Sequence, residues 1–231
     1  MHQKRLSAKE NYPIKKKIKE RFVICPTPGP HPKNYSVPLA ALMRDVVGYC
    51  ENTREARKVI KSGKIMVDGK IRKNHRYPVG IFDVVTISGI NENYIITQTE
   101  RWLNAVKTKD GKIKLCRIEN KKILKGGKIQ LNLHDGKNMI TKKNDYKTGD
   151  SLMVEIPNLK IKKHIKRKKG SMCLITKGRN KGKIGKLKEV KKSLGSTQNR
   201  VSVDIDQKTV EIPEKIIFVL GEKKPEINLG E

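Results

Sequence analysis

The sequence predicts an α+β protein, mostly β, that is built of several small modules behind a basic arm. Hydrophobic residues make up 35% of the 231 residues and aromatic residues only 4%, a composition that suits several small cores better than one large core. Two consecutive runs have helical periodicity, and short strand-like runs separated by glycine-containing turns fill most of the remainder. We therefore expect an arm, a helix-and-hairpin domain, a central β-domain and a C-terminal β-module, at residues 1–38, 39–92, 93–165 and 166–231.

The expected arm combines basic clusters with a proline-rich stretch. Residues 25–33 contain four prolines, and each proline fixes its own φ and pushes the preceding residue toward extended geometry. The arm has little apolar content, so it cannot stabilise itself. We expect it to become ordered only against a partner surface.

Two helices and a hairpin are expected in the next domain. Apolar residues at helical spacing over 39–47 predict the first helix, and Asn52 with Glu55 has the spacing of a capping box at the start of the second. The pair Asp68-Gly69 between alternating apolar residues predicts a hairpin. A strand-like run at 83–87 completes the domain.

The two C-terminal modules show only strand and turn signals. Expected strands lie at residues 94–97, 112–116, 128–131, 151–156, 172–176, 184–187, 201–203 and 216–220. A basic linker at 160–169 separates the modules, and the strands of the last module suit a five-stranded barrel. Neither module has the long βαβ alternation of a nucleotide-binding enzyme.

The charge balance predicts a polyanionic partner. The chain has 53 Lys and Arg against 23 Asp and Glu, a formal net charge of +30. Such an excess destabilises a free compact chain by self-repulsion, and nucleic acid is the first candidate for neutralising it. The basic residues alternate with Ile, Val and Leu along the whole chain, so we expect an extended interface on folded elements and not one pocket.

Two segments carry the best candidates for contacts with RNA. The loop Lys177–Lys183 has glycines that allow close approach of backbone to phosphate, but it lacks the ending of a P-loop. The second helix and its hairpin present one sign of charge, which suits the shape-based recognition of folded RNA. A solvated loop and a solvated helix face are the plainer alternatives. With the arm included, the candidate RNA-binding residues are Lys4, Arg5, Lys15, Lys16, His31, Arg44, Arg54, Arg57, Lys58, Lys61, Lys64, Lys70, Arg72, Lys177, Arg179, Asn180, Lys181 and Lys183.

No metal, cofactor or catalytic site is expected. The four cysteines are far apart without C-x-x-C spacing, which predicts reduced thiols, and the five histidines are scattered. His134-Asp135-Gly136 resembles half of a catalytic pair, but Asp-Gly is first a turn signal and no nucleophile motif accompanies it. The chain also lacks an apolar run of about 20 residues and a signal peptide. We expect a cytoplasmic protein that is not an enzyme, with no membrane partner and no small-molecule substrate.

The order of these motifs resembles the S-four-e family of archaeal and eukaryotic small-subunit ribosomal proteins. The resemblance covers nearly the whole chain. It rests on residues 2–6, 26–31 with 38–39, 68–72, 77–80 with 83–84, 114–116 and the Gly-Arg-Asn-Lys-Gly loop at 178–182. The short sequence after 218–221 is similar to archaeal members.

The resemblance implies a function and three domains. Residues 39 to about 87 are similar to the S-four RNA-binding domain, and residues from about 170 look like a KOW module on an SH3-like barrel. Family membership implies binding to small-subunit rRNA beside neighbouring small-subunit proteins in the ribosome. The generic S-four domain often has Ser-Arg where this chain has Asn52-Thr53, so Arg54 and Arg57 both remain candidates for the main phosphate contact.

Other functional classes lack the sequence features they require. An RNA-modifying enzyme with an S-four domain needs an additional catalytic domain, and a KOW-bearing transcription factor needs a polymerase-binding α/β domain. A membrane-surface protein needs an amphipathic helix with bulky apolar residues opposite its lysines. A KOW-bearing transcription or translation factor, or a non-catalytic RNA-binding protein off the ribosome, remains the alternative.

Overall fold

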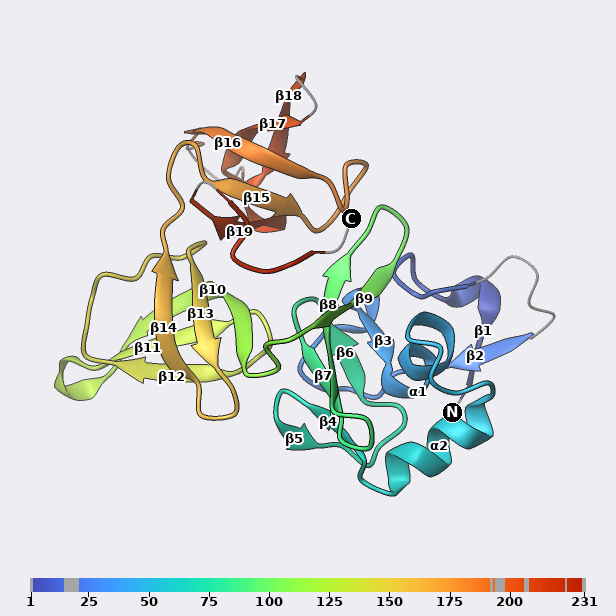
Figure 1. The fold of residues 1–231 in the computed structure, drawn as a ribbon. Coiled ribbons are helices and arrows are strands. Elements are labelled where there is room, and N and C mark those ends of the chain that lie inside the picture. The colour runs from blue at the N-terminus through green and yellow to red at the C-terminus, as the bar shows by residue number, and fades with distance from the viewer. Residues whose placement is uncertain are drawn as a thin grey trace. The chain divides into compact units, whose positions relative to one another are not determined.

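The computed structural model describes residues 2–14, 21–191, 193, 198–205, 208–222 and 224–229 (Figure 1). The chain forms two compact units. Unit 1 comprises residues 1–114 and 156–158 with the last two residues, and unit 2 comprises 115–155 and 159–229. Strands dominate both units, which confirms the predicted α+β, mostly β fold class.

Unit 1 contains one five-stranded antiparallel sheet and two strand pairs. The sheet has the order β5-β4-β7-β8-β9, with strands β4 (Ile65–Val67), β5 (Lys70–Ile71), β7 (Val84–Ile87), β8 (Glu92–Gln98) and β9 (Leu103–Thr108). The pairs are β1 (His2–Lys4) with β2 (Phe22–Ile24), and β3 (Ser36–Pro38) with β6 (Pro78–Gly80). Strands β8 and β9, expected in the central domain, instead extend this sheet, because β8 pairs with β7 across a tight turn.

Both predicted helices are present. Helix α1 (Leu39–Ala41) continues into a π-helical segment, Leu42–Val46, and α2 spans Thr53–Lys61. The side chain of Asn52 accepts a hydrogen bond from the Glu55 N–H at 2.9 Å, as the capping-box spacing predicts. The Glu55 carboxylate accepts the N–H of Glu51, one residue before the position that the standard box uses.

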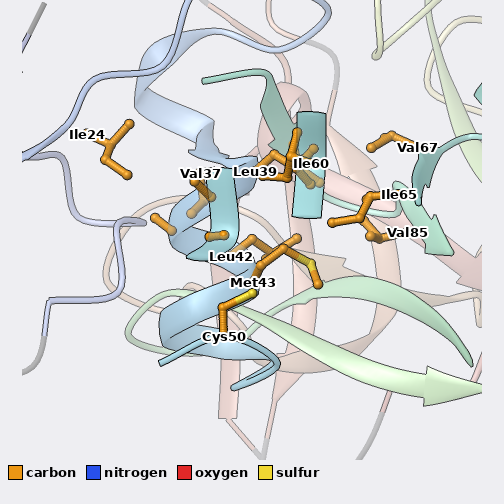
Figure 2. Close-up of a cluster of buried hydrophobic side chains, with 14 of the residues drawn as sticks. Ile24, Val37, Leu39, Leu42, Met43, Cys50, Ile60, Ile65, Val67 and Val85 are labelled. Atoms are coloured by element: carbon orange, nitrogen blue, oxygen red, sulfur yellow. The ribbon is translucent and has the colours of Figure 1, made fainter. Parts of the chain in front are cut away.

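The described parts of the predicted arm, residues 2–14 and 21–38, contribute to the core of unit 1, which corrects the expectation that these parts would order only against a partner. Tyr12, Val23, Ile24 and Val37 are buried in the same cluster as the residues of α1. Figure 2 draws Ile24 and Val37 in this cluster. The few apolar residues of the segment are sufficient because strand pairing satisfies its backbone and turns them inward.

A buried lysine joins three segments of unit 1. The side chain of Lys114 is 0% exposed, and its Nζ lies 2.6 Å from an Oδ of Asp68 and 2.6 Å from an Oδ of Asp83. The two carboxylates also accept backbone N–H groups, from Val84 to Asp68 and from Gly80 to Asp83. Each charge therefore has the partners that burial requires.

His31 completes this buried network. Its Nε2 lies 2.9 Å from the Asp83 carboxylate. Burial alone would raise the pKa of Asp83, but the charges of His31 and Lys114 outweigh burial and hold the pKa of Asp83 well below its ordinary value of 3.8. The carboxylate is thus ionised in the folded protein.

Unit 2 contains two five-stranded antiparallel sheets. The first has the order β12-β11-β10-β13-β14, with β10 (Ile113–Ile123), β11 (Ile129–Leu133), β12 (Asn138–Thr141), β13 (Ser151–Glu155) and β14 (Lys160–Ile165). The second has the order β18-β17-β16-β15-β19, with β15 (Met172–Ile175), β16 (Ile184–Lys191), β17 (Arg200–Ile205), β18 (Lys208–Pro213) and β19 (Ile217–Gly221). Closure of the second sheet into a barrel stays a prediction.

The expected basic linker is mostly a strand. Residues 160–165 form β14, which pairs with β13. Its lysines are exposed, whereas Ile165 is buried, so the strand has an outer cationic side and an inner apolar end. Lysine has low strand propensity, and pairing with a buried neighbour overrides that preference here.

We expect Lys114→Ala to lower the free energy of unfolding of unit 1 by about 3–5 kcal/mol, because two buried carboxylates lose their shared cation. Urea unfolding followed by the fluorescence of Trp102, the only tryptophan and a residue of unit 1, measures this change. The matched control is Lys112→Ala, two residues away and exposed, which should change it by less than about 0.5 kcal/mol. If Lys114→Ala and Lys112→Ala lowered the free energy of unfolding equally, the buried Lys114 network would not be stabilising.

Acid stability should depend on Asp83. Its folded pKa is lowered, so its stabilisation is complete well above pH 3.8, the value of an ordinary carboxyl, and is lost as the pH falls below that value and the unfolded chain takes up the proton. Between about pH 6 and about pH 3, Asp83→Asn should therefore lose less unfolding free energy than the wild type. Urea titrations across this range test the difference, with exposed Glu100→Gln as the control that keeps the wild-type slope.

Candidate nucleic-acid interface

Helix α2 turns its basic residues outward. Ala56 and Ile60 are fully buried against the core, which fixes the rotation of the helix. Arg54, Lys58 and Lys61 are exposed. Sequence analysis predicts this division, because apolar residues four positions apart mark one face.

Among the residues that the structure describes, the cations of α2 and the hairpin have no acidic partners. Within the described residues none of the following forms an ion pair: Arg54, Arg57, Lys58, Lys61, Lys64, Lys70 and Arg72. Some exposed lysines elsewhere do have acidic partners, as in Lys107 with Glu92 and Lys191 with Glu211. The seven unpaired residues, which we call the α2–hairpin face, therefore carry uncompensated positive charge.

The hairpin lies against the end of α2. Gly63 follows the helix with φ +77°, and a Cβ added there would come within 3.5 Å of Ile71 and 3.7 Å of the Lys73 side chain. The Arg72 guanidinium stacks 4.5 Å from the centre of the Tyr77 ring. The end of α2 and the hairpin are thus adjacent.

Two candidate residues point inward, which corrects their assignment to RNA. His31 is 5% exposed and bound to Asp83. The Arg44 side chain is 11% exposed, and its guanidinium donates to both Asp45 oxygens and to the Thr53 hydroxyl. Buried polar groups require such internal partners. Neither residue is retained as an RNA contact.

Two of the N-terminal candidates are described by the structure: Lys4 ends strand β1, and Arg5 begins the short 3-10 turn after it. Lys4 is exposed at the end of β1, opposite the exposed Phe22 of β2. Arg5 is half-buried, and its backbone N–H donates to the Arg21 carbonyl at 3.1 Å. The remaining candidates of the arm, Lys15 and Lys16, lie outside the described residues.

The loop from Lys177 to Lys183 connects β15 and β16. Its glycines have φ values of +86° and +83°, which only glycine adopts readily, and backbone hydrogen bonds to Ile175 close it. Arg179 is exposed, and Lys177, Asn180 and Lys183 are half-exposed. Lys181 is only 7% exposed, so we no longer assign it to RNA.

Sequence reasoning missed a group of cations after the hairpin. Lys73, His75 and Arg76 belong to the same basic run as Arg72, and that run is the signal that could have identified them. Burial lowers the pKa of His75 below its ordinary 6.5, and the nearby charges of Arg57, Arg76 and Lys61 lower it further.

One group of side chains could contribute to a metal site. Ligand atoms of Cys116, His134 and Asp135 all lie within 4.8 Å of one another. The Nδ1 of His134 already accepts the Arg117 N–H, and Asp135 lies 3.2 Å from the Lys137 ammonium. A structural zinc ion requires four ligands, and this group offers three. The expected absence of metal stays a prediction.

Unit 2 also contains a polar cavity of about 550 Å³. Its two acids, Glu119 and Glu214, form ion pairs with Arg117 and Arg167. Burial would raise the pKa of Glu214, but hydrogen bonds from Arg167 and Asn199 lower it overall. A general acid near neutral pH needs a raised pKa, so Glu214 does not fit that role. No helix in the described ranges is long and apolar enough to cross a membrane.

Four family models match successive parts of the chain. They are the RS4NT domain at residues 1–34, the S4 domain at 38–85, Ribosomal family S4e at 90–161 and the KOW motif at 169–204. The S4 match contains α1, α2 and the hairpin. The order of the four matches is the order of modules expected from the sequence.

Similar proteins cover the whole chain. The small ribosomal subunit protein eS4 of Methanocella arvoryzae is 40% identical over 98% of this chain and 96% of its own length. That of Archaeoglobus fulgidus is 42% identical over 100% of this chain and 98% of its own length. The crystal structure of the 30S ribosomal protein S4e from Thermoplasma acidophilum is 29% identical, with a TM-score of 0.70 over 81% of this chain and 96% of that chain.

The Asn52 cap should stabilise the helix that presents the face. We expect Asn52→Ala to lower the free energy of unfolding of unit 1 by about 1 kcal/mol, because the Glu55 N–H loses its acceptor. Asn52→Asp keeps an acceptor and adds a negative charge at the helix N-terminus, so it should be at least as stable as the wild type. Urea unfolding compares the three proteins, and equal stability of Asn52→Ala and wild type would contradict the role of the cap.

Proposed function

The chain belongs to ribosomal family S4e, and from this membership we infer that it is a structural constituent of the small ribosomal subunit that binds and stabilises small-subunit rRNA in translation. Its relatives carry the name of that subunit over nearly their whole length. The chain acts by binding, without a catalytic step. Its place is the ribosome in the cytoplasm.

The α2–hairpin face supports this function best. Seven cations that form no ion pair within the described part of the chain lie on a helix and a hairpin that the core holds in position. Phosphates neutralise such charges and release counterions, which is the main sequence-independent source of affinity for RNA. The face thus contacts rRNA phosphates and 2′-hydroxyls more than base edges.

Further contacts extend the proposed interface. In unit 1 they are Lys4 and Arg5, together with Lys15 and Lys16 of the arm. In unit 2 they come from the glycine-containing loop, through Lys177, Arg179, Asn180 and Lys183. Neighbouring small-subunit proteins are the other partners, and no membrane, cofactor or small-molecule substrate takes part.

An RNA-binding role off the ribosome, as a KOW-bearing factor, is the less favoured alternative. Names of full-length relatives do not support it. Sucrose-gradient sedimentation of a cell extract at low salt separates the two. Comigration with small subunits is expected, whereas recovery at the top of the gradient without RNA would contradict the proposed function.

Salt dependence tests the α2–hairpin face directly. In a variant with Arg54, Lys58 and Lys70 each changed to Gln, the slope of log affinity for small-subunit rRNA against log salt should shrink by about 2–3, because each lost phosphate contact removes about 0.7–0.9. Filter binding over a salt series measures the slope.

The matched control removes three charges that acids already neutralise. Lys107, Lys188 and Lys191, each changed to Gln, are exposed and paired with Glu92, Asp204 and Glu211. The control should keep nearly the wild-type slope. Equal losses in both triple variants would mean that net charge, and not the α2–hairpin face, determines the affinity.

A further inference from the structure

We propose that the β10–β11 hairpin and the neighbouring strand β12 form a second RNA-binding surface, which holds unpaired nucleotides through lysines at the hairpin tip and amides on the outer sheet face. The proposal rests on the function inferred above and assigns it a further contact surface, in unit 2. Strands β10, β11 and β12 are consecutive neighbours in one antiparallel sheet (Figure 1). None of the residues in 120–143 is among the RNA-binding candidates predicted from the sequence.

The tip of the β10–β11 hairpin is open to a partner. The Leu124 N–H donates to the Lys128 carbonyl at 2.8 Å, which closes the tip around Gly126 and Gly127. Both glycines have positive φ, +77° and +68°, and a Cβ added to either would meet no atom within 4 Å. They are therefore needed for the turn and not for packing. Within the described part of the chain, the space beside these two residues is open.

The cations around the tip have no acidic partners among the described residues. Asp135 is the only acid in residues 120–144, and its side chain is 0% exposed and lies beside the Lys137 ammonium. The exposed lysines in this range that form no ion pair are Lys122, Lys125, Lys128, Lys142 and Lys143. This end of the sheet therefore carries positive charge that no surface acid offsets.

Strand register brings most of these lysines together. Ile123 pairs with Ile129, and Ile129 pairs with Thr141, in the last row before the tip. The lysines next to this row or in the tip itself are Lys122, Lys125, Lys128 and Lys142. Adjacent strands lie about 5 Å apart, so the backbones at these positions are neighbours. The register thus concentrates the unpaired cations at one end of three strands.

The outer face of the same three strands carries amides. Ile129 and Leu131 are buried, so the alternate residues Gln130 and Asn132 face away from the core. Pairing extends this face across the neighbouring strands, because residues directly opposite each other share a face. It consists of two rows, Asn120–Asn132–Asn138 and Lys122–Gln130–Ile140. The face contains no acid.

Amides of this kind suit the edges of unpaired bases. Each amide both donates and accepts hydrogen bonds, as base edges do. Asn120 and Asn138 are exposed, and neither side chain has a hydrogen-bond partner in the described part of the chain. Ile140, 65% exposed on the same face, offers an apolar contact to a base or a ribose. Because duplex RNA hides most of its base edges, a surface that combines amides with phosphate-binding lysines fits unpaired nucleotides best.

Salt dependence tests the lysines of the tip. In the full chain, Lys122, Lys125 and Lys128 are each changed to Gln, and a short labelled single-stranded RNA of mixed sequence is the probe. The slope of log affinity against log salt should shrink by about 2, because each phosphate contact with a single strand contributes about 0.7. Fluorescence anisotropy over a salt series measures the slope.

The matched control removes three exposed lysines of unit 2 that already have acidic partners. They are Lys163, Lys188 and Lys191, paired with Glu226, Asp204 and Glu211. Changed to Gln, they should leave nearly the wild-type slope. If the tip variant behaves like this control, the tip lysines only keep the sheet from aggregating and the proposal is wrong. If the tip variant loses as much affinity for polyglutamate as for RNA, the surface suits an acidic protein instead.

The exposed amides test the assignment to unpaired nucleotides. Asn120→Ala combined with Asn138→Ala should weaken binding of the single-stranded RNA about tenfold, because hydrogen bonds to bases are lost. Affinity for the duplex that this RNA forms with its complement should change by less than about twofold. Equal weakening for both probes would contradict the assignment. Far-UV circular dichroism and urea unfolding verify that each variant is folded.

The two proposals fail in different ways. If the wild type binds rRNA and both the tip variant and the amide variant bind single-stranded RNA as the wild type does, the second surface is wrong and the proposed function stands. If the folded wild type does not bind rRNA at any salt concentration tested, both are wrong.

Discussion

Lys114 constrains unit 1 because an ammonium group with no exposure to water must keep its anionic partners. Those partners are Asp68, in the turn of the hairpin, and Asp83, immediately before β7. Removing either would leave an uncompensated buried charge, which is among the most destabilising changes in a protein. The pairing therefore fixes the hairpin against the start of β10, and through His31 it also fixes the proline-rich segment.

The buried acids of unit 1 also explain why its surface carries excess positive charge. The acids of the S4-like region are largely used internally: Asp68 and Asp83 bind Lys114, Asp45 binds Arg44, and Glu55 caps α2 through the Glu51 N–H. Few carboxylates remain to pair with the cations outside. The uncompensated charge of the α2–hairpin face is thus a product of how the fold distributes its acids, as well as of the net charge of +30.

Local signals in the sequence predicted local structure well. The Asn52 cap, the Asp68-Gly69 turn and most strands follow from spacing and turn chemistry within a few residues. The direction of a lysine or histidine side chain does not follow from such signals. Lys181 and His31 face inward and Lys114 is fully buried, because residues distant in sequence provide their surroundings. Strand β14 was missed for the same reason, since pairing with β13 outweighs the weak strand propensity of its lysines.

The unpaired cations of the α2–hairpin face affect the stability of the free protein. Like charges at neighbouring positions of α2 destabilise the helix by a few tenths of a kcal/mol for each pair, and the Asn52 cap and the burial of Ile60 oppose that effect. A ligand that binds only the folded state stabilises it by linkage. Phosphates bound at the α2–hairpin face would therefore have two effects. They would remove the repulsion between the cations of α2, and they would stabilise the folded state of unit 1. The same cations that weaken the isolated fold are the ones that make it suited to an RNA surface.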